Sequence, residues 1–422
     1  RSYLAIVMSF LLIITFCYKQ VRLYQQSHYH ISSFKKIIKN FYINKRSYLL
    51  VPLIFFSLYL QFWYIQLALS FYLGFLILIQ YKERVKLRLK ITARIRRLYI
   101  AIVFVMTIFG SLVSLIIPLK QLMAALVAVA IFSPLLVFLS ALITWPLEVL
   151  ISLYYQKLAI RKLNKYQTTR IGITGSYGKT STKNILQAYL QNYFMSVSTR
   201  QSFNTQNGVS RCINEDLQAY HEILIVEMGA THKNDISKLV KLTKPKYGII
   251  TAIGPQHLES FKSVENILLE KIKLVESLPA DGLAVINFDN QYLKNHPLKT
   301  NCRIITFGLD EGANYQAFDL KLSLKGQKFK IKHNEQVVSL ETKLLGRHQV
   351  YNILAAYALA KELGISEEEL INQTALLESV EHRLEIRKEK SLTIINDGFN
   401  SNIEGFMNAL EILSLHQKYR II

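Results

Sequence analysis

The sequence predicts an all-α transmembrane domain at residues 1–146, followed by an α/β domain with a mostly parallel sheet. The chain is 51% hydrophobic, which is high for a soluble protein, and its long uncharged runs lie before residue 147. From residue 167 onward, short apolar strands alternate with helical stretches, a pattern typical of parallel α/β sheets. A third observation is a glycine-rich turn that follows the first of these strands.

The net charge of +22 is unevenly distributed along the chain. Residues 1–170 contain 22 Lys and Arg but only two acidic residues, Glu83 and Glu148, so they carry +20 and the remainder carries +2. The basic residues lie between the apolar runs, where the positive-inside rule places them in membrane proteins. The charge therefore indicates membrane topology, and we expect no nucleic-acid partner.

Four apolar runs predict the membrane spans, at residues 3–17, 47–81, 98–117 and 122–144. The second run is uncharged over 35 residues, and one helix of that length would be about 50 Å long, beyond a hydrocarbon core of ~30 Å. Because basic loops flank it on both sides, we expect two short legs, five spans in total, and four as the alternative. The other alternative is a set of buried helices in a soluble domain.

Residues 147–166 mix apolar and basic side chains, and we expect an amphipathic connecting helix along the membrane surface. The α/β domain should then occupy residues 167–376. Its strands are expected at residues 222–229, 247–254, 284–287 and 303–307, with the last two closing the sheet. Residues 377–422 should form the incomplete beginning of a second α/β domain.

Local patterns define the end of the α/β domain. Residues 318–344 alternate between apolar and polar around Lys325 and Gly326, which predicts a β-hairpin. Residues 348–363 should form a helix that ends at Gly364. Ser366 and Glu369 have the spacing of a capping box for the helix that follows.

The glycine-rich turn has the residue types of a phosphate-binding loop. Gly175 and Gly178 let backbone N–H groups approach an anion closely, and the helix that follows directs its positive end at the same point. Lys179 adds a full positive charge, and Thr180 offers a hydroxyl to a magnesium ion. The strict P-loop pattern requires a glycine where Ile173 stands. A plain glycine turn is the alternative, but the flanking strand and helix favour a nucleotide-phosphate site.

An acidic residue ends the next predicted strand. Glu227 follows the phosphate loop in the chain, and a carboxylate at a strand end can hold magnesium directly or through water. The alternative is a solvated acid without a function. His257 lies just beyond another strand end, where a single histidine is more often structural than a ligand.

Six motifs resemble the Mur ligases in order and spacing over about residues 167–422, at positions 174–181, 226–230, 253–258, 346–352, 382–384 and 396–402. Glu-Met-Gly-Ala at 227–230 looks most like the MurF type, which adds D-alanyl-D-alanine to a UDP-muramoyl-tripeptide.

The resemblance implies ATP and two magnesium ions as cofactors. It assigns the phosphates to the loop residues Gly175, Ser176, Gly178, Lys179, Thr180 and Ser181. It assigns magnesium to Thr180, Glu227, His257 and Lys271, with Lys271 carbamylated. It places Asn352 near the adenine, Asp397 on the ribose and Arg383 on the phosphates, and it gives catalytic roles to Lys179, Lys271, His257 and Arg383.

Two of these assignments have plain alternatives. Relatives usually carry an acid two residues after the carbamylated lysine, whereas this chain has Lys273, so Lys271 could be an ordinary surface lysine. The resemblance also implies that Asn204, Thr205 and Gln206 meet the substrate or the metal, although an Asn-rich turn is also a common loop.

The expected function is that of a MurF-like, ATP-dependent amide ligase of peptidoglycan synthesis. It would be a multi-pass protein of the bacterial cell membrane, with its catalytic domains in the cytoplasm and membrane lipid as a partner. One alternative is a Mur-type ligase that acts on a lipid-linked cell-wall precursor. Another is an ATP-driven membrane transport or signalling module, which is disfavoured because the sequence has no second nucleotide motif and the spans contain no charged pathway.

Overall fold

The computed structural model describes most of the chain from residue 89 onward. The described residues are 17–27, 89–116, 133–200, 203–323, 325–379 and 403–415, with shorter pieces within 29–39 and 384–398. The predicted spans at 3–17 and 47–81 therefore lie outside the described residues, apart from Cys17. The chain forms two compact units, Arg1–Ser152 and Leu153–Ile422.

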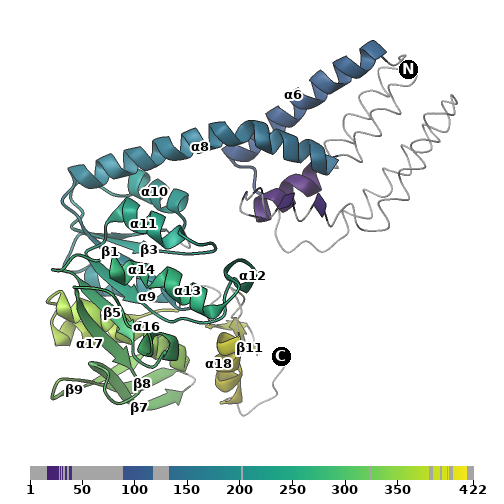
Figure 1. The fold of residues 1–422 in the computed structure, drawn as a ribbon. Helices are drawn as coiled ribbons and strands as arrows, with labels where there is room; N and C mark the ends of the chain where they lie inside the picture. The colour runs from purple at the N-terminus through teal and green to yellow at the C-terminus, as the bar shows by residue number, and fades with distance from the viewer. Residues whose placement is uncertain are drawn as a thin grey trace. The chain divides into compact units, whose positions relative to one another are not determined.

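From residue 169 to residue 308 helices separate the strands, and further strands then follow one another directly to residue 342 (Figure 1). The helices are α6 Ala93–Ile116, α8 Ser133–Lys165, α9 Lys179–Leu190, α10 Gln206–Glu215, α11 Asp235–Thr243, α12 Leu258–Phe261, α13 Val264–Lys271, α14 Lys273–Glu276, α15 Gln291–Lys294, α16 Arg347–Glu362, α17 Glu367–Leu376 and α18 Ile403–Ser414. The strands are β1 Thr169–Thr174, β2 Ser196–Ser198, β3 Ile223–Glu227, β4 Tyr247–Ile250, β5 Leu283–Asn287, β6 Arg303–Gly308, β7 Tyr315–Ser323, β8 Gly326–His333, β9 Gln336–Thr342, β10 Glu385–Glu389 and β11 Leu392–Asn396.

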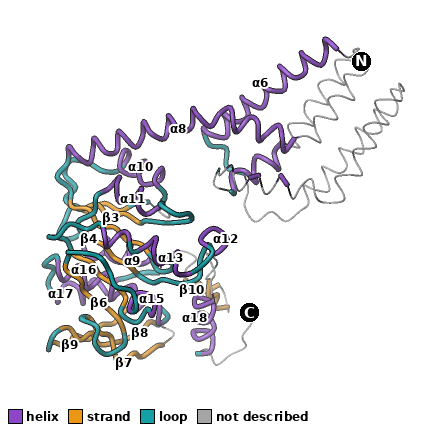
Figure 2. The backbone as a smooth tube through the Cα atoms, in the orientation of Figure 1, coloured by secondary structure: helices purple, strands orange, loops and turns teal. Residues whose placement is uncertain are grey.

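The strands β1 to β9 form one sheet in the order β2-β3-β1-β4-β5-β6-β7-β8-β9. Pairing is parallel from β2 to β7 and antiparallel from β7 to β9. The mostly parallel α/β sheet expected from the sequence is confirmed. Figure 2 shows the strands of the second unit side by side with helices packed around them.

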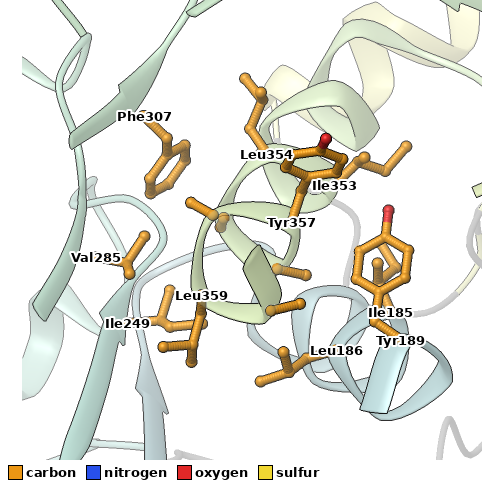
Figure 3. Close-up of a cluster of buried hydrophobic side chains, with 14 of the residues drawn as sticks. Ile185, Leu186, Tyr189, Ile249, Val285, Phe307, Ile353, Leu354, Tyr357 and Leu359 are labelled. Carbon is orange, nitrogen blue, oxygen red and sulfur yellow. The ribbon is translucent and has the colours of Figure 1, made fainter. Parts of the chain in front are cut away.

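The sheet is covered on both faces by buried apolar side chains. Alternate residues of β1, β3 and β4 face opposite ways, as a strand requires. Ile173, Ile225 and Ile249 pack against α9, α16 and α17 on one face, where Tyr189 and Tyr357 contribute large buried rings (Figure 3). Val226 and Ile250 pack on the other face against α10, α11, α13 and α14. Both faces are thus buried, which holds the strand ends in fixed positions.

The sheet extends further than the sequence indicated. We expected residues 284–287 and 303–307 to close it, but β7 pairs with β6 and the sheet continues to β9. The expected hairpin at 318–344 is a three-stranded antiparallel meander, because a second turn at Asn334, with φ of 53°, divides it. The helix stop at Gly364 is confirmed by its φ of 94°, and Ser366 accepts a hydrogen bond from the N–H of Glu369.

The first unit contains α6 and the N-terminal part of α8, and the remainder of α8 belongs to the second unit. α8 continues without a break through Pro146, so the span expected to end at residue 144 and the connecting helix expected at 147–166 are one helix. Within the unit, Arg97 donates two hydrogen bonds to the half-buried carboxylate of Glu148, at 2.6 and 3.0 Å. This ion pair joins α6 to α8. Among the described residues, one helix, α8, is long and apolar enough to cross a membrane.

Candidate active site

The carboxyl ends of three neighbouring strands define the site. β1 lies between β3 and β4 in the sheet, although β2 and β3 follow it in the chain. Ligands of parallel α/β sheets bind at such a switch point, outside the carboxyl ends of the strands. Ile173 of β1 is level with Glu227 of β3, and Thr174 is level with Ile250 of β4. The predicted phosphate loop and two predicted metal-binding segments therefore start side by side.

The phosphate loop adopts a conformation that needs its glycines. Gly175 and Gly178 have φ of 155° and 80°, in the region that favours glycine. A Cβ at Gly175 would overlap the hydroxyl of Thr251, and one at Gly178 would overlap the side-chain oxygen of Asn352. α9 begins immediately afterwards at Lys179, with no side-chain cap on its N-terminus. Backbone N–H groups at this helix start can donate hydrogen bonds to an anion.

Two lysines converge on one carbonyl of the loop. Lys179 Nζ donates to Gly175 O at 2.8 Å, and Lys271 Nζ donates to the same oxygen at 2.9 Å. Lys271 is fully buried, with an exposed fraction of 2%. Burial first, and then the charge of Lys179, lowers the pKa of the Lys271 amine well below its ordinary value. Lys271 is therefore not an ordinary surface lysine, and its amine is held close to the loop.

The structure also explains Lys273, which stands where relatives usually carry an acid. Lys273 donates to the carboxylate of Glu270 at 2.6 Å. Glu270 in turn accepts from the backbone N–H groups of Asn234 and Ile236 at the start of α11. The acid that precedes Lys271 thus stabilises a helix start, and Lys273 balances its charge.

The segment that follows β4 forms one wall of the loop. Ser176 Oγ donates to Gly254 O and accepts from Gly254 N, both at 3.0 Å, and the hydroxyl of Tyr177 donates to Pro255 O at 3.0 Å. This segment leads directly to His257, an exposed residue with φ of 52°. A left-handed conformation is uncommon for histidine, so the backbone is constrained where the predicted metal ligand lies.

Glu227 is buried at the end of β3, with an exposed fraction of 1%. Its Oε1 accepts from Asn204 Nδ2 at 3.0 Å, and its Oε2 lies 3.7 Å from the ammonium of Lys183. Lys183 is equally buried and donates to Thr199 O at 2.6 Å. The solvated strand-end acid considered above is therefore excluded. Glu227 is a desolvated carboxylate, balanced by one lysine and oriented by one amide.

The donor set fits a magnesium ion. Glu227 Oε2 is buried and has no hydrogen-bond partner within the part of the chain that the structure describes, and such an oxygen is expected beside a cation. Thr180, at the start of α9, is nearly buried at 8% exposure and supplies a hydroxyl. Among the described residues, no three His, Cys, Asp or Glu side chains cluster around one point. A metal here would thus rely on hydroxyl and lysine-derived oxygens as well.

Asn352 of α16 borders the phosphate loop. Its side-chain oxygen accepts from the hydroxyl of Thr182 at 3.2 Å, and its amide donates to Gln349 Oε1 at 3.0 Å. Ser181, beside Thr182, is buried at 5% exposure. α16 is thereby fixed against α9 at the edge of the loop, and the adenine contact of Asn352 stays a prediction.

The predicted substrate loop divides into different roles. Asn204 orients Glu227, whereas Thr205 is the N-cap of α10 and accepts from Gly208 N. Gln206 donates to Gln156 of α8 at 3.0 Å. Arg383 and Asp397 lie outside the described residues, so their roles stay predictions.

Two residues that the sequence did not single out belong to this site, Lys183 and Thr251. Lys183 lies one helical turn after Lys179, and that i to i+4 spacing was the available signal. Thr251 directly follows a strand that pairs with β1, a place where polar side chains often serve a site.

Comparison with protein families matches residues 173–360 to the Mur ligase middle domain. This segment is a Mur ligase middle domain. It contains the phosphate loop, Glu227, His257, Lys271 and Asn352. The family resemblance seen in the sequence is therefore confirmed for this part of the chain.

Relatives of the Mur ligase domain include UDP-N-acetylmuramoyl-tripeptide--D-alanyl-D-alanine ligases. The Buchnera aphidicola protein is 33% identical over 60% of this chain, and the Bacillus subtilis protein is 31% identical over 63%. The matches span 55% and 57% of those two proteins, so the chain spans little more than half of their length.

Solved structures give the same result. MurF from Acinetobacter baumannii superposes with a TM-score of 0.60 at 25% identity, covering 63% of this chain and 58% of that one. MurF from Thermotoga maritima in complex with ADP has a TM-score of 0.57 at 27% identity, covering 62% and 61%. The second unit therefore has a MurF-like fold.

Proposed function

We propose that this protein is an ATP-dependent amide ligase of the MurF type, which joins D-alanyl-D-alanine to a UDP-muramoyl-tripeptide in peptidoglycan synthesis. The observation that carries the proposal is the convergence of Lys179 and Lys271 on one carbonyl of a phosphate-type loop, with the buried Glu227 at the end of the neighbouring strand. Relatives with this middle domain carry the name of that activity.

The reaction has two steps. A carboxylate oxygen of the tripeptide attacks the γ-phosphorus of ATP, and the bond to ADP breaks. The amine of D-alanyl-D-alanine then attacks the acyl phosphate carbonyl, loses a proton, and phosphate leaves. The protein mainly positions the partners and neutralises charge. Lys179 and the start of α9 would hold the phosphates, and Arg383 would reach them from the last domain.

Magnesium would be held by Thr180 and Glu227, and a second ion by His257 and a carbamylated Lys271. Bound there, the ions would neutralise the charge of the transferred phosphoryl group. Only a neutral amine reacts with CO₂ to form a carbamate, and the lowered pKa of the Lys271 amine favours that form. ¹³C NMR of the protein in ¹³CO₂-enriched buffer should show a carbamate signal that Lys271→Ala removes. Lys241→Ala, at an exposed position of α11, should retain that signal.

The deciding experiment measures ATP hydrolysis by the full-length chain with both substrates. Turnover should require D-alanyl-D-alanine and UDP-muramoyl-tripeptide together. Lys179→Ala should reduce it by about 100-fold or more, as expected for a group that stabilises transferred charge, and Lys241→Ala should not. If no pair of amine and muramoyl peptide stimulated hydrolysis, the proposal would be wrong.

Membrane attachment is the second part of the proposal, with the catalytic unit in the cytoplasm. α6 and α8 expose large apolar side chains along their length, for example Phe104 at 58%, Leu115 at 83% and Leu150 at 64%. Such continuous apolar surface is unusual on a soluble protein. The +20 charge of residues 1–170 fits the cytoplasmic face of a membrane.

A lipid-linked precursor is the second candidate substrate, and the contacts of α8 are the observation that favours it. The helix that could cross a membrane also binds the predicted substrate loop, through Gln156 to Gln206 and Asn207. Release of ADP with UDP-linked or lipid-linked acceptors would distinguish the two substrates.

A further inference from the structure

The phosphate loop does not by itself determine which way its peptide groups face. Glycines at positions 175 and 178 accept either orientation of the neighbouring peptide planes at little cost. An anion is bound by N–H groups and repelled by carbonyl oxygens, so one orientation binds phosphate and the other opposes it. Something outside the loop has to select the orientation.

The hydroxyl of Thr251 makes the contacts that select the orientation of these peptide groups. Its hydroxyl donates to Tyr177 O and lies 3.3 Å from Thr174 O. In a trans peptide the C=O and the following N–H point in opposite directions. Holding the carbonyls of residues 174 and 177 toward β4 therefore turns the N–H groups of Gly175 and Gly178 the other way.

Thr251 is itself held in place from both sides. Its N–H donates to Thr174 O at 3.0 Å, and its carbonyl accepts from Asn287 Nδ2 at 2.8 Å, at the end of β5. The residue is 5% exposed. A Cβ at Gly175 would overlap this same hydroxyl, so the Thr251 hydroxyl can occupy its position only because residue 175 is a glycine.

We propose that Thr251 is a positioning residue that sets the phosphate loop in its anion-binding orientation before any nucleotide arrives. The inference rests on the proposed nucleotide site. Thr251 would not need to touch the nucleotide, because it acts through the peptide between Tyr177 and Gly178.

The test compares three variants of the full-length chain. Thr251→Val keeps the shape and removes the hydroxyl, and Thr251→Ser keeps the hydroxyl. Thr243→Val is the matched control, because Thr243 is also buried and donates to one carbonyl, Leu239 O, at 2.8 Å in α11. Binding of Mg-ADP and of adenosine is measured by calorimetric titration, and the melting temperature is recorded for each variant.

Thr251→Val should weaken ADP binding about tenfold, because a loop N–H would no longer be oriented to donate to a phosphate, and one lost hydrogen bond to a charged group has about that effect. Adenosine binding should stay within about twofold, since adenosine has no phosphate. Thr251→Ser should restore ADP binding, and Thr243→Val should lower only the melting temperature.

Two results would overturn the inference. The first is equal ADP affinity in Thr251→Val and wild type, and the second is an equal loss of affinity for ADP and adenosine. The second would mean that Thr251 merely supports the fold. A wild-type chain that binds no ADP would instead refute the nucleotide site itself, and with it the role of Thr251.

Discussion

Three buried charged side chains surround the phosphate loop, Lys183, Glu227 and Lys271. Burying an unpaired charge is costly, so each needs a physical explanation. Lys183 and Glu227 balance each other, whereas burial lowers the pKa of the Lys271 amine, which favours its neutral form and reduces the cost. Charge concentrated at a strand end without surface exposure is typical of a functional site.

The Lys183 and Glu227 pair should behave as one unit. Lys183→Met and Glu227→Gln should each lower the free energy of unfolding by about 3 kcal/mol, because each leaves a buried charge alone. The double variant leaves no buried charge alone, so it should lose less stability than either single variant. Chemical denaturation of all four proteins measures this, and the double variant should still lack ATP turnover.

The matched control is the exposed pair of Lys246 and Asp281, whose side chains are 42% and 72% exposed. Removing both should change stability by less than about 1 kcal/mol. Strictly additive losses at Lys183 and Glu227 would show that the two charges are not coupled.

Gly178 should be needed for more than its backbone angle. Gly178→Ala and Gly364→Ala both place a Cβ at positive φ, 80° and 94°, and both should cost about 1 kcal/mol. Only at Gly178 would the Cβ also overlap Asn352, since nothing lies within 4 Å of a Cβ at Gly364. ADP affinity, measured beside stability, should therefore fall for Gly178→Ala alone. A comparable loss for Gly364→Ala would assign the effect to general destabilisation.

At the scale of single residues, the sequence could predict those site residues that belong to a local motif or end a strand. The glycines, Lys179 and Glu227 follow a motif or end a strand, and the structure places them together. Lys183 and Thr251 depend on partners 44 and 74 residues away, Glu227 and Tyr177. Those distances arise only when the sheet forms, so a single sequence does not show them.

Two helix N-caps allow an effect on stability to be separated from an effect on binding. Thr205 caps α10 by accepting from Gly208 N at 3.3 Å, and Ser366 caps α17 by accepting from Glu369 N at 3.3 Å. Replacing either residue by alanine should cost about 1 kcal/mol of stability. If Thr205 also meets the substrate, only Thr205→Ala should raise KM for the muramoyl peptide, by several-fold. Equal KM values in the two variants would leave Thr205 as a cap alone.

Among the elements, the strands β3 to β6 begin within one residue of their expected starts, because each is a short apolar run bounded by turn residues. β2 was not expected, and β4 ends at Ile250 rather than at residue 254. β5 was expected at 284–287 and found at Leu283–Asn287. The β7 to β9 meander was underestimated because its turn at Asn334 has no glycine. The continuity of α8 was missed because the composition changes from an apolar run to a mixture of apolar and basic residues, and one helix spans both parts and passes through Pro146.

At the scale of the whole molecule, the two units differ in physical character. Residues 1–170 carry almost all of the net positive charge, and the described helices α6 and α8 expose large apolar side chains. The second unit instead has a sheet with two buried faces. Sequence composition distinguished the two parts, but the number of spans depends on residues 3–17 and 47–81, which the structure does not describe.

Two forces could hold the full-length chain to a membrane, and they respond differently to salt. Attraction of basic residues to anionic lipids weakens as the Debye length falls to about 3 Å at 1 M salt, whereas insertion of apolar helices does not depend on charge. We expect the chain, reconstituted with anionic liposomes, to stay in the membrane pellet in 1 M NaCl and after an alkaline carbonate wash. Release by salt would mean that α6 and α8 lie on the surface and that the +20 charge provides the attachment, so a spanning anchor would be wrong.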